Sequence, residues 1–267
     1  MPSETLLPQP VVFAVVGDYG SRLPKEGEVA DLVMSWKPEF IITVGDNNYP
    51  SGAWEHMDEA VGQFYYSYIY PYSGSYGEGA DVNRFFPTIG NHDLQTDDAQ
   101  PYLDYFTLPG NERYYDFVWG PLHFFALNNV DDPDGVFASS VQAKWLQQRL
   151  AESTSPWNIV YMHYPPYSSG AHGSTAWARW PYMEWGADVV LAGHDHTYER
   201  LDVNGLTYIV NGLGGAAIYN FGYILEGSQV RYNSGLGAMR VEATDQSIMF
   251  EFITLDNEVI DTYEMTK

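Results

Sequence analysis

The chain has 267 residues, which is long enough for a substantial core, and its formal net charge is -23 at pH 7. That charge argues against nucleic acid and anionic membranes as partners, because both require a basic surface. Cysteine is absent, which excludes a disulfide framework and thiolate metal ligands.

The first half of the chain predicts two strand units joined by a helix. Apolar, β-branched runs at Val11–Val16 and Phe40–Val44 predict buried strands, each followed directly by Gly-Asp. The spacing of apolar residues between them predicts a helix over 28–36. This βαβ pattern indicates a parallel sheet. Asp18 and Asp46 would then lie at the carboxyl ends of strands, where open α/β sheets place their ligand sites.

The middle of the chain predicts a helix, a loop, a third strand and a hairpin. The helix is expected within 54–70, and a Gly-, Ser- and Tyr-rich loop follows it over 71–81. Phe85–Ile89 predicts an irregular strand, because it contains Pro87, and it leads into Gly90-Asn91-His92-Asp93. The runs 114–119 and 122–127 predict a hairpin that turns at Gly120-Pro121.

The second half predicts further strand ends and a strand-rich finish. A helix capped by Ser139 or Ser140 is expected to run to Leu150. A strand over 157–162 delivers His163, a loop over 164–175 follows, and a helix is expected near 177–185. A strand over 188–191 ends in Gly193-His194-Asp195-His196. From Leu206 onward alternating patterns predict strands, among them 237–243, 247–254 and 258–265.

No internal repeat and no linker is visible, so we predict one domain over 1–267, with 1–10 as an N-terminal extension and a sheet-on-sheet core.

Five predicted strand ends carry groups that can bind metal. They are Asp18; Asp46 with Tyr49; Asn91 with His92; His163; and His194 with His196. Oxygen and imidazole ligands without thiolate suit iron, manganese or zinc. A pair of ions about 3.5–4 Å apart is the arrangement used for in-line phosphoryl displacement, and it needs a bridging carboxylate. Outside this set, His56 and His123 are expected to be surface or satisfied core residues.

These blocks resemble the signature of the calcineurin-like metallophosphoesterase superfamily and, within it, of the purple acid phosphatases. They stand in order as Gly17–Gly20, Gly45–Tyr49, Gly90–Asp93, Val160–His163 and Gly193–His196. The tyrosine of the second block is typical of the purple subset, since a phenolate suits ferric iron. His172 follows His163 by nine residues, a spacing similar to the small mammalian-type, single-domain enzymes. No plant-type N-terminal domain is visible.

The resemblance implies a fold and a set of residue roles. The fold is an α/β (α+β by some schemes) sandwich of two mixed sheets flanked by helices, built from βαβ units. The implied roles are Asp18, Tyr49 and His196 on Fe(III); Asn91, His163 and His194 on a divalent iron, zinc or manganese ion; and Asp46 bridging both. His92 would face the substrate phosphate. His172 is a second candidate for phosphate binding or leaving-group protonation, the alternative being an exposed loop histidine.

The implied activity is that of a dinuclear metal-dependent acid phosphatase, which hydrolyses phosphate monoesters by in-line attack of a metal-bound hydroxide. Its ligands would be a small phosphorylated substrate and inorganic phosphate. One alternative is a related two-metal phosphodiesterase or nucleotide pyrophosphohydrolase, against which Tyr49 counts. A non-catalytic scaffold with this fold is a second alternative. A third is a redox role, in which a mixed-valence iron pair reacts with peroxide as a side activity of the same site. The natural substrate and a monomeric or homodimeric state stay open. We expect a secreted or periplasmic protein whose leader is absent from this chain.

Overall fold

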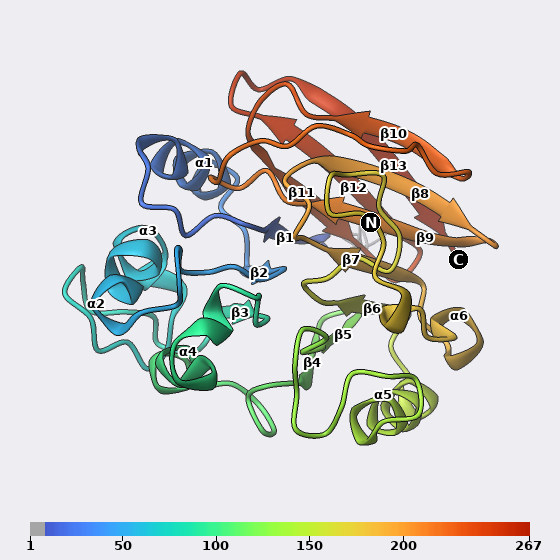
Figure 1. Ribbon diagram of the computed structural model, residues 1–267, viewed down its shortest axis with the longest axis horizontal. Coiled ribbons are helices and arrows are strands. Elements are labelled where there is room, and N and C mark those ends of the chain that lie inside the picture. The colour runs from blue at the N-terminus through green and yellow to red at the C-terminus, as the bar shows by residue number, and fades with distance from the viewer. Residues whose placement is uncertain (1–8) are drawn as a thin grey trace, which may run out of the picture.

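The computed structural model describes residues 9–267, which form two mixed β-sheets packed face to face with helices on the outside (Figure 1). The six-stranded sheet has the order β13 (Val259–Thr266), β12 (Ser247–Thr254), β11 (Gly237–Ala243), β1 (Val11–Val16), β2 (Phe40–Thr43) and β3 (Phe85–Pro87). The seven-stranded sheet has the order β10 (Ser228–Tyr232), β8 (Tyr198–Val203), β9 (Leu206–Asn211), β7 (Val189–Ala192), β6 (Trp157–Tyr161), β5 (Leu122–Ala126) and β4 (Tyr115–Trp119). This arrangement confirms the expected fold class.

Parallel strands form one side of the first sheet and the centre of the second. In the first sheet β1, β2 and β3 are parallel, while β11 adds to β1 in the antiparallel direction. In the second sheet β5, β6, β7 and β9 are parallel. The predicted hairpin at Gly120-Pro121 is present as the antiparallel pair β4–β5.

The helices cover the outer sides of the two sheets (Figure 1). Four lie beside the first sheet: α1 (Pro24–Ser35), α2 (Trp54–Met57), α3 (Gln63–Tyr65) and α4 (Gln100–Tyr105). Two lie beside the second: α5 (Val141–Glu152) and α6 (Tyr182–Trp185). Helix α1 begins at Pro24, earlier than predicted, since proline is favoured in the first turn of a helix. Helix α5 is capped as expected, because Ser140 Oγ accepts a hydrogen bond from the Ala143 amide at 3.0 Å.

Two predicted helices differ from the structure. The region 54–70 is helical only to Tyr68, and a π-helical turn (Asp58–Gly62) separates α2 from α3. The helix expected near 177–185 is instead a 3₁₀ turn (Ala176–Ala178) followed by the single turn of α6. Pro181 explains this break, because proline lacks an amide donor and disfavours a helical conformation in the residue before it. Helix α4 and strand β8 were not predicted.

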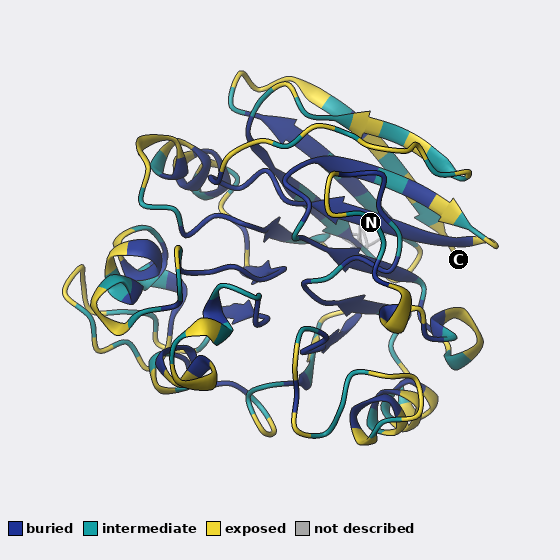
Figure 2. Cartoon of the chain, viewed as in Figure 1, coloured by how far each residue is buried: buried dark blue, intermediate teal, exposed yellow. Residues whose placement is uncertain are grey.

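Aromatic side chains fill the space between the sheets. The Phe13 ring of β1 meets the Phe124 ring of β5 edge-on, with 5.2 Å between ring centroids. Phe40 of β2 contacts the same ring at 5.3 Å, and Tyr198 of β8 stacks on Phe252 of β12 at 4.3 Å. The central strands are buried on both faces (Figure 2), which explains their continuous apolar sequences.

The carboxyl ends of the central strands of both sheets meet at one edge. His163, after β6, donates from Nδ1 to the carbonyl of Val44, after β2, at 2.8 Å, and accepts at its own carbonyl from the Gly193 amide at 3.0 Å. The strand ends predicted to carry ligands therefore come together. The single-domain prediction stays a prediction, and residues 1–8 of the expected extension lie outside the described part. Within residues 9–267, no helix has the length and apolar character needed to cross a membrane.

Candidate metal centre

Three of the predicted ligands adopt left-handed backbone conformations where their strands end. The φ angles are 56° at Asp18, 54° at Asp46 and 70° at His194. Such values are uncommon outside glycine and cost free energy that the surrounding structure has to offset. Hydrogen bonds to the turns supply part of that offset, including one from the Asp18 amide to the Gly45 carbonyl at 3.1 Å. The conformation turns each side chain toward the edge where the sheets meet.

Two glycines allow these turns to approach closely. A Cβ atom on Gly45, whose φ is +93°, would lie 2.5 Å from Nδ1 of His163. A Cβ atom on Gly193 would lie 2.7 Å from an oxygen of Asp18. A side chain at either position would therefore displace a predicted ligand, which gives the glycines of the Gly-Asp and Gly-His blocks a steric role.

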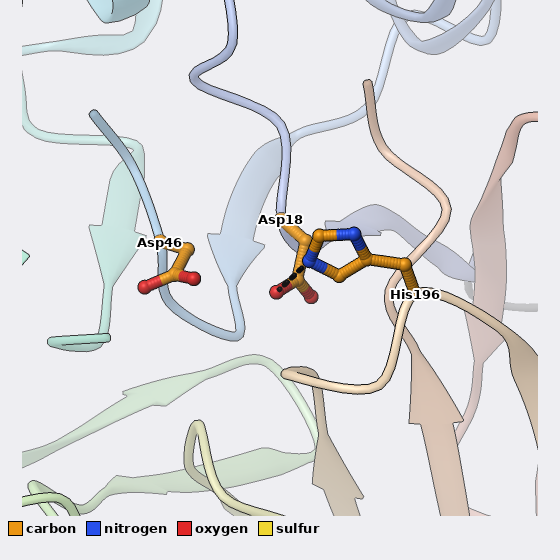
Figure 3. Close-up of side chains that lie close together, drawn as sticks. All are labelled: Asp18, Asp46 and His196. Atoms are coloured by element: carbon orange, nitrogen blue, oxygen red, sulfur yellow. Dashed lines mark ion pairs between the residues drawn. The ribbon is translucent and has the colours of Figure 1, made fainter. Parts of the chain in front are cut away.

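Asp18, Asp46 and His196 lie close together (Figure 3), and with Tyr49, which contacts all three, they form the first cluster. The Tyr49 hydroxyl lies 2.9 Å from Asp46 Oδ2, 3.4 Å from Asp18 Oδ1 and 3.1 Å from His196 Nε2. His196 Nε2 lies 3.4 Å from Asp18 Oδ1, the ion pair drawn in Figure 3. One carboxylate or imidazole ligand atom from each of Asp18, Asp46 and His196 falls within 4.8 Å of the others. A single cation between these atoms would contact all four residues.

A second cluster shares Asp46 with the first. His163 Nε2 lies 3.0 Å from Asn91 Oδ1 and 3.4 Å from Asp46 Oδ1. The His194 ring lies beside His163, with 5.1 Å between ring centroids. Asp46 therefore presents Oδ2 to Tyr49 and Oδ1 to His163, which is the geometry that a bridging carboxylate requires.

Backbone carbonyls orient one histidine in each cluster. His163 Nδ1 is bonded to the Val44 carbonyl, and His196 Nδ1 to the Ala217 carbonyl. Because Nδ1 donates in each case, Nε2 faces the cluster, and in the neutral form of either ring it carries the lone pair that a metal ion would bind. Such outer hydrogen bonds are the usual support of metal-binding histidines.

Burial and neighbouring charges set the pKa values of the clustered groups. Burial would raise the pKa of Asp18, but the hydrogen bond with His196 and its charge lower it overall. For His196 burial acts to lower the pKa, and the bond to Asp18 raises it above the ordinary value. Burial and repulsion from His163 lower the pKa of His194 to about 2, so this imidazole is neutral, as a metal ligand must be. Burial and the two carboxylates raise the pKa of Tyr49 well above 10.

The donor set fits a pair of cations. Asp18 and Asp46 are 0% and 1% exposed, and within residues 9–267 their only ion-pair partners are histidines. Burying a charge without compensation is strongly unfavourable. Two buried carboxylates beside a phenol therefore need more positive charge than these histidines provide. Two cations would supply that charge. Their ligand atoms would all be oxygen or imidazole nitrogen, which suits iron, zinc or manganese.

His92 and His172 each border one of the two clusters. His92 Nε2 is 3.9 Å from Asp46 Oδ2, its Nδ1 is bonded to the Pro50 carbonyl, and its side chain is 31% exposed. The exposed His172 ring stacks on His194 at 4.2 Å between centroids. Both therefore border the clusters and are accessible from solvent. Of the remaining histidines, His123 is a satisfied core residue as expected, with its ring nitrogens 2.7 Å from Asp116 and 2.9 Å from Ser153.

The sequence analysis missed residues that hold the blocks together. Asp93 accepts hydrogen bonds from the Gly90 amide at 2.8 Å and from Asn47 Nδ2 at 2.8 Å, so it ties the second block to the third. The Tyr219 ring stacks on His196 at 4.0 Å and 8° between planes. The position of Asp93 inside the third block was a sequence signal that it could join the blocks. Nothing near Tyr219 signals its contact, because it follows an irregular glycine-rich turn.

Comparisons with known proteins agree with this geometry. A family model described as "Calcineurin-like phosphoesterase" matches residues 6–198. The chain is 30% identical over 256 residues to Purple acid phosphatase 15 of Arabidopsis thaliana, covering 80% of this chain and 47% of that protein. It is 26% identical over 241 residues to Tartrate-resistant acid phosphatase type 5 of Mus musculus, covering 76% of this chain and 72% of that protein.

The fold is also similar to that of a solved structure. A purple acid phosphatase from yellow lupin (Lupinus luteus) seeds matches with a TM-score of 0.77 and 17% identity, covering 96% of this chain and 54% of that chain. At this identity the likeness concerns the fold alone. The chain spans about half the length of the first curated relatives it matches.

Proposed function

The chain belongs to the calcineurin-like phosphoesterase family, and from this premise we propose that it is a two-metal acid phosphatase that hydrolyses phosphate monoesters. The observation that carries the proposal is the position of the Tyr49 hydroxyl, within 3.4 Å of Asp18, Asp46 and His196. A phenol placed among these ligand atoms suits ferric iron, and the similarity to purple acid phosphatases supports the same assignment.

Each cluster would hold one cation. Asp18, Tyr49 and His196 would bind Fe(III), and Asn91, His163 and His194 would bind a divalent iron, zinc or manganese ion. Asp46 would bridge the two. When bound, the pair would neutralise the phosphoryl oxygens and lower the pKa of a water molecule, which makes hydrolysis possible at acidic pH. The cations would also let a protein of net charge -23 bind an anionic ester.

The chain's own residues would handle the leaving group. Hydrolysis forms a P–O bond to the water oxygen and breaks the P–O bond to the alcohol. The departing oxygen needs one proton, and His92 can donate it from Nε2, because its Nδ1 is already bonded to the Pro50 carbonyl. The proton released by water then restores the imidazolium, so atoms and charge balance. His172 stacks on His194 and is the second candidate for this role or for binding the phosphate.

A visible absorption spectrum with metal analysis tests the proposal. We expect a broad violet or pink band and about two metal ions per chain, one of them iron. Tyr49→Phe should abolish the band while the fold is retained. A colourless protein with two zinc or manganese ions would contradict the ferric assignment. Faster hydrolysis of a phosphate diester than of the matching monoester would contradict the monoesterase assignment and favour the phosphodiesterase alternative.

We also propose, from the acidic and lysine-poor composition alone, that the protein is secreted or periplasmic. Fractionation of the native host's cells, with the activity assayed in each fraction, tests this.

A further inference from the structure

A run of aromatic rings leads away from the proposed divalent site. His194, a proposed ligand, lies against Tyr164 with 4.3 Å between ring centroids. Tyr164 in turn meets Trp177 edge-on at 6.2 Å. On the other side His172 stacks on His194 at 4.2 Å. A continuous aromatic surface therefore connects the metal centre to Trp177, whose side chain is 41% exposed.

These rings border one pocket. It has a volume of about 330 Å³ and is lined by Tyr164, His172, Gly173, Ser174, Thr175, Trp177 and His194. The volume is at the lower end of the range for small-molecule sites, which suits one ring better than a large ligand. The lining contains no lysine, arginine, aspartate or glutamate. His172 is therefore the one side chain of the lining that could pair with an anion, whereas a neutral planar group would find the faces of several rings.

Asn129 fixes the two outer rings of this pocket. It lies just beyond the carboxyl end of β5 and is fully buried. Its side chain donates to the Tyr164 carbonyl at 2.7 Å and accepts from the Tyr164 amide at 2.9 Å. Its own carbonyl accepts from the Trp177 indole at 3.2 Å. One buried residue thus holds the backbone of Tyr164 and the ring of Trp177, so the pocket is preorganised.

We propose that this pocket binds the alcohol part of the substrate and selects neutral aromatic leaving groups. Trp177 and Tyr164 are the specificity-determining residues, and Asn129 is a positioning residue. The inference rests on the proposed function, since an ester whose phosphate sits at the metal centre would direct its alcohol past His194 into the pocket. Aromatic rings attract one another beyond simple area burial, and indole offers the largest face.

The test compares phenyl phosphate with ethyl phosphate in the metal-loaded protein. Trp177→Ala should lower kcat/KM for phenyl phosphate about tenfold, mainly through KM, and change it less than about twofold for ethyl phosphate. Trp177→Phe should keep most of the wild-type kcat/KM for phenyl phosphate. Phe137→Ala is the matched control, because Phe137 is 62% exposed and does not line the pocket. Because each variant is compared with wild type on both esters, the intrinsic reactivity of the esters cancels.

Binding of phenylphosphonate and ethylphosphonate, measured by calorimetry, gives a readout that needs no turnover. Wild type should prefer phenylphosphonate, and Trp177→Ala should lose that preference. Equal affinity for both compounds in wild type, or equal losses on both in the variant, would overturn the inference. If neither ester is hydrolysed by protein with both metals bound, the proposed function fails. The phosphonate preference then still decides whether the pocket selects aromatic groups.

Discussion

The carboxylate of Asp195 accepts a hydrogen bond from the backbone amide of His172, with 2.8 Å between Oδ1 and the nitrogen. The same carboxylate accepts from Ser168 Oγ at 2.5 Å and from the Gly173 amide at 3.1 Å. Asp195 stands between the proposed ligands His194 and His196. It therefore joins the loop that carries His172 directly to the turn that carries those ligands.

Asp195→Ala should weaken both the fold and the activity. It leaves three donors without their partner, two of them on the loop backbone, so we expect the free energy of unfolding to fall by about 2–4 kcal/mol. Displacement of His172 should lower kcat/KM by about tenfold or more. Urea unfolding and steady-state kinetics measure the two effects. Asp245→Ala, at an exposed turn, is the control and should behave as wild type. An Asp195 variant with wild-type stability would show that the loop does not depend on this carboxylate.

His92→Ala should reduce turnover without removing metal. General acid catalysis contributes roughly 10²–10⁴-fold, and we expect kcat to fall within that range. Metal analysis should still give the wild-type content, because the seven proposed ligands are all retained in this variant. The variant His56→Ala provides the comparison, since His56 belongs to neither cluster. Loss of metal along with activity would make His92 a ligand and reverse the assigned role.

Asp46→Asn should affect the metal-loaded and metal-free proteins in opposite directions. With metal bound, the variant loses the bridging charge, and its melting temperature should fall below that of wild type. After treatment with a chelator, wild type retains two buried carboxylates in one site, while the variant retains one. The variant should then be the more stable of the two. Thermal unfolding in both states, at fixed pH, checks the sign change. The same sign in both states would argue against cation binding at this carboxylate.

Glu26 should make stability depend on pH. Burial raises the pKa of this carboxyl group from 4.5 to about 8, and its Oε1 has no hydrogen-bond partner among the described residues. A raised carboxyl pKa means that the folded state binds the proton more tightly than the unfolded state. Its stabilising contribution is therefore complete below pH 4.5 and is lost as the pH rises through 8. The total change is about 3–5 kcal/mol.

Glu26→Gln isolates that contribution. The difference in free energy of unfolding between wild type and this variant should shift in favour of the variant as the pH increases from 4.5 to 8. Urea titrations at several pH values measure it, and glutamine keeps the size of the side chain. A constant difference over this range would mean that Glu26 titrates as in an unfolded chain.

Local patterns predicted the strand ends and the polar side chains that follow them, because a buried apolar run followed by Gly-Asp or Gly-His indicates both. That these side chains bind metal stays a prediction. The order of the sheets was not predictable from such patterns. Strand β1 pairs with β11, and the register places Val11 opposite Ala243, a contact between distant parts of the sequence. Strand β8 was not predicted, because Tyr198–Val203 begins almost directly after the block Gly193–His196, with no turn signal to mark its start.

The aromatic pocket lay beyond sequence analysis for a different reason. Tyr164 and Trp177 belong to a loop and a 3₁₀ turn, which are held by hydrogen bonds to Asn129, a buried residue just after strand β5. Neither element has a periodic pattern. The irregular helical region 54–68 has a similar cause, because Gly62 lies against the side chains of Asp58, Tyr72 and Tyr105, and the helix widens by one π turn there. Tertiary contacts thus override the local helical pattern.

The position of β1 between β2 and β11 also affects when the metal centre can form as the chain is synthesised. All seven proposed ligands lie between residues 18 and 196, so they are synthesised before residues 237–243. Strand β11, which completes the sheet around β1, emerges only with residues 237–243. A chain that ends before residue 237 lacks the partner of β1 and should therefore bind metal weakly, even though it contains every proposed ligand.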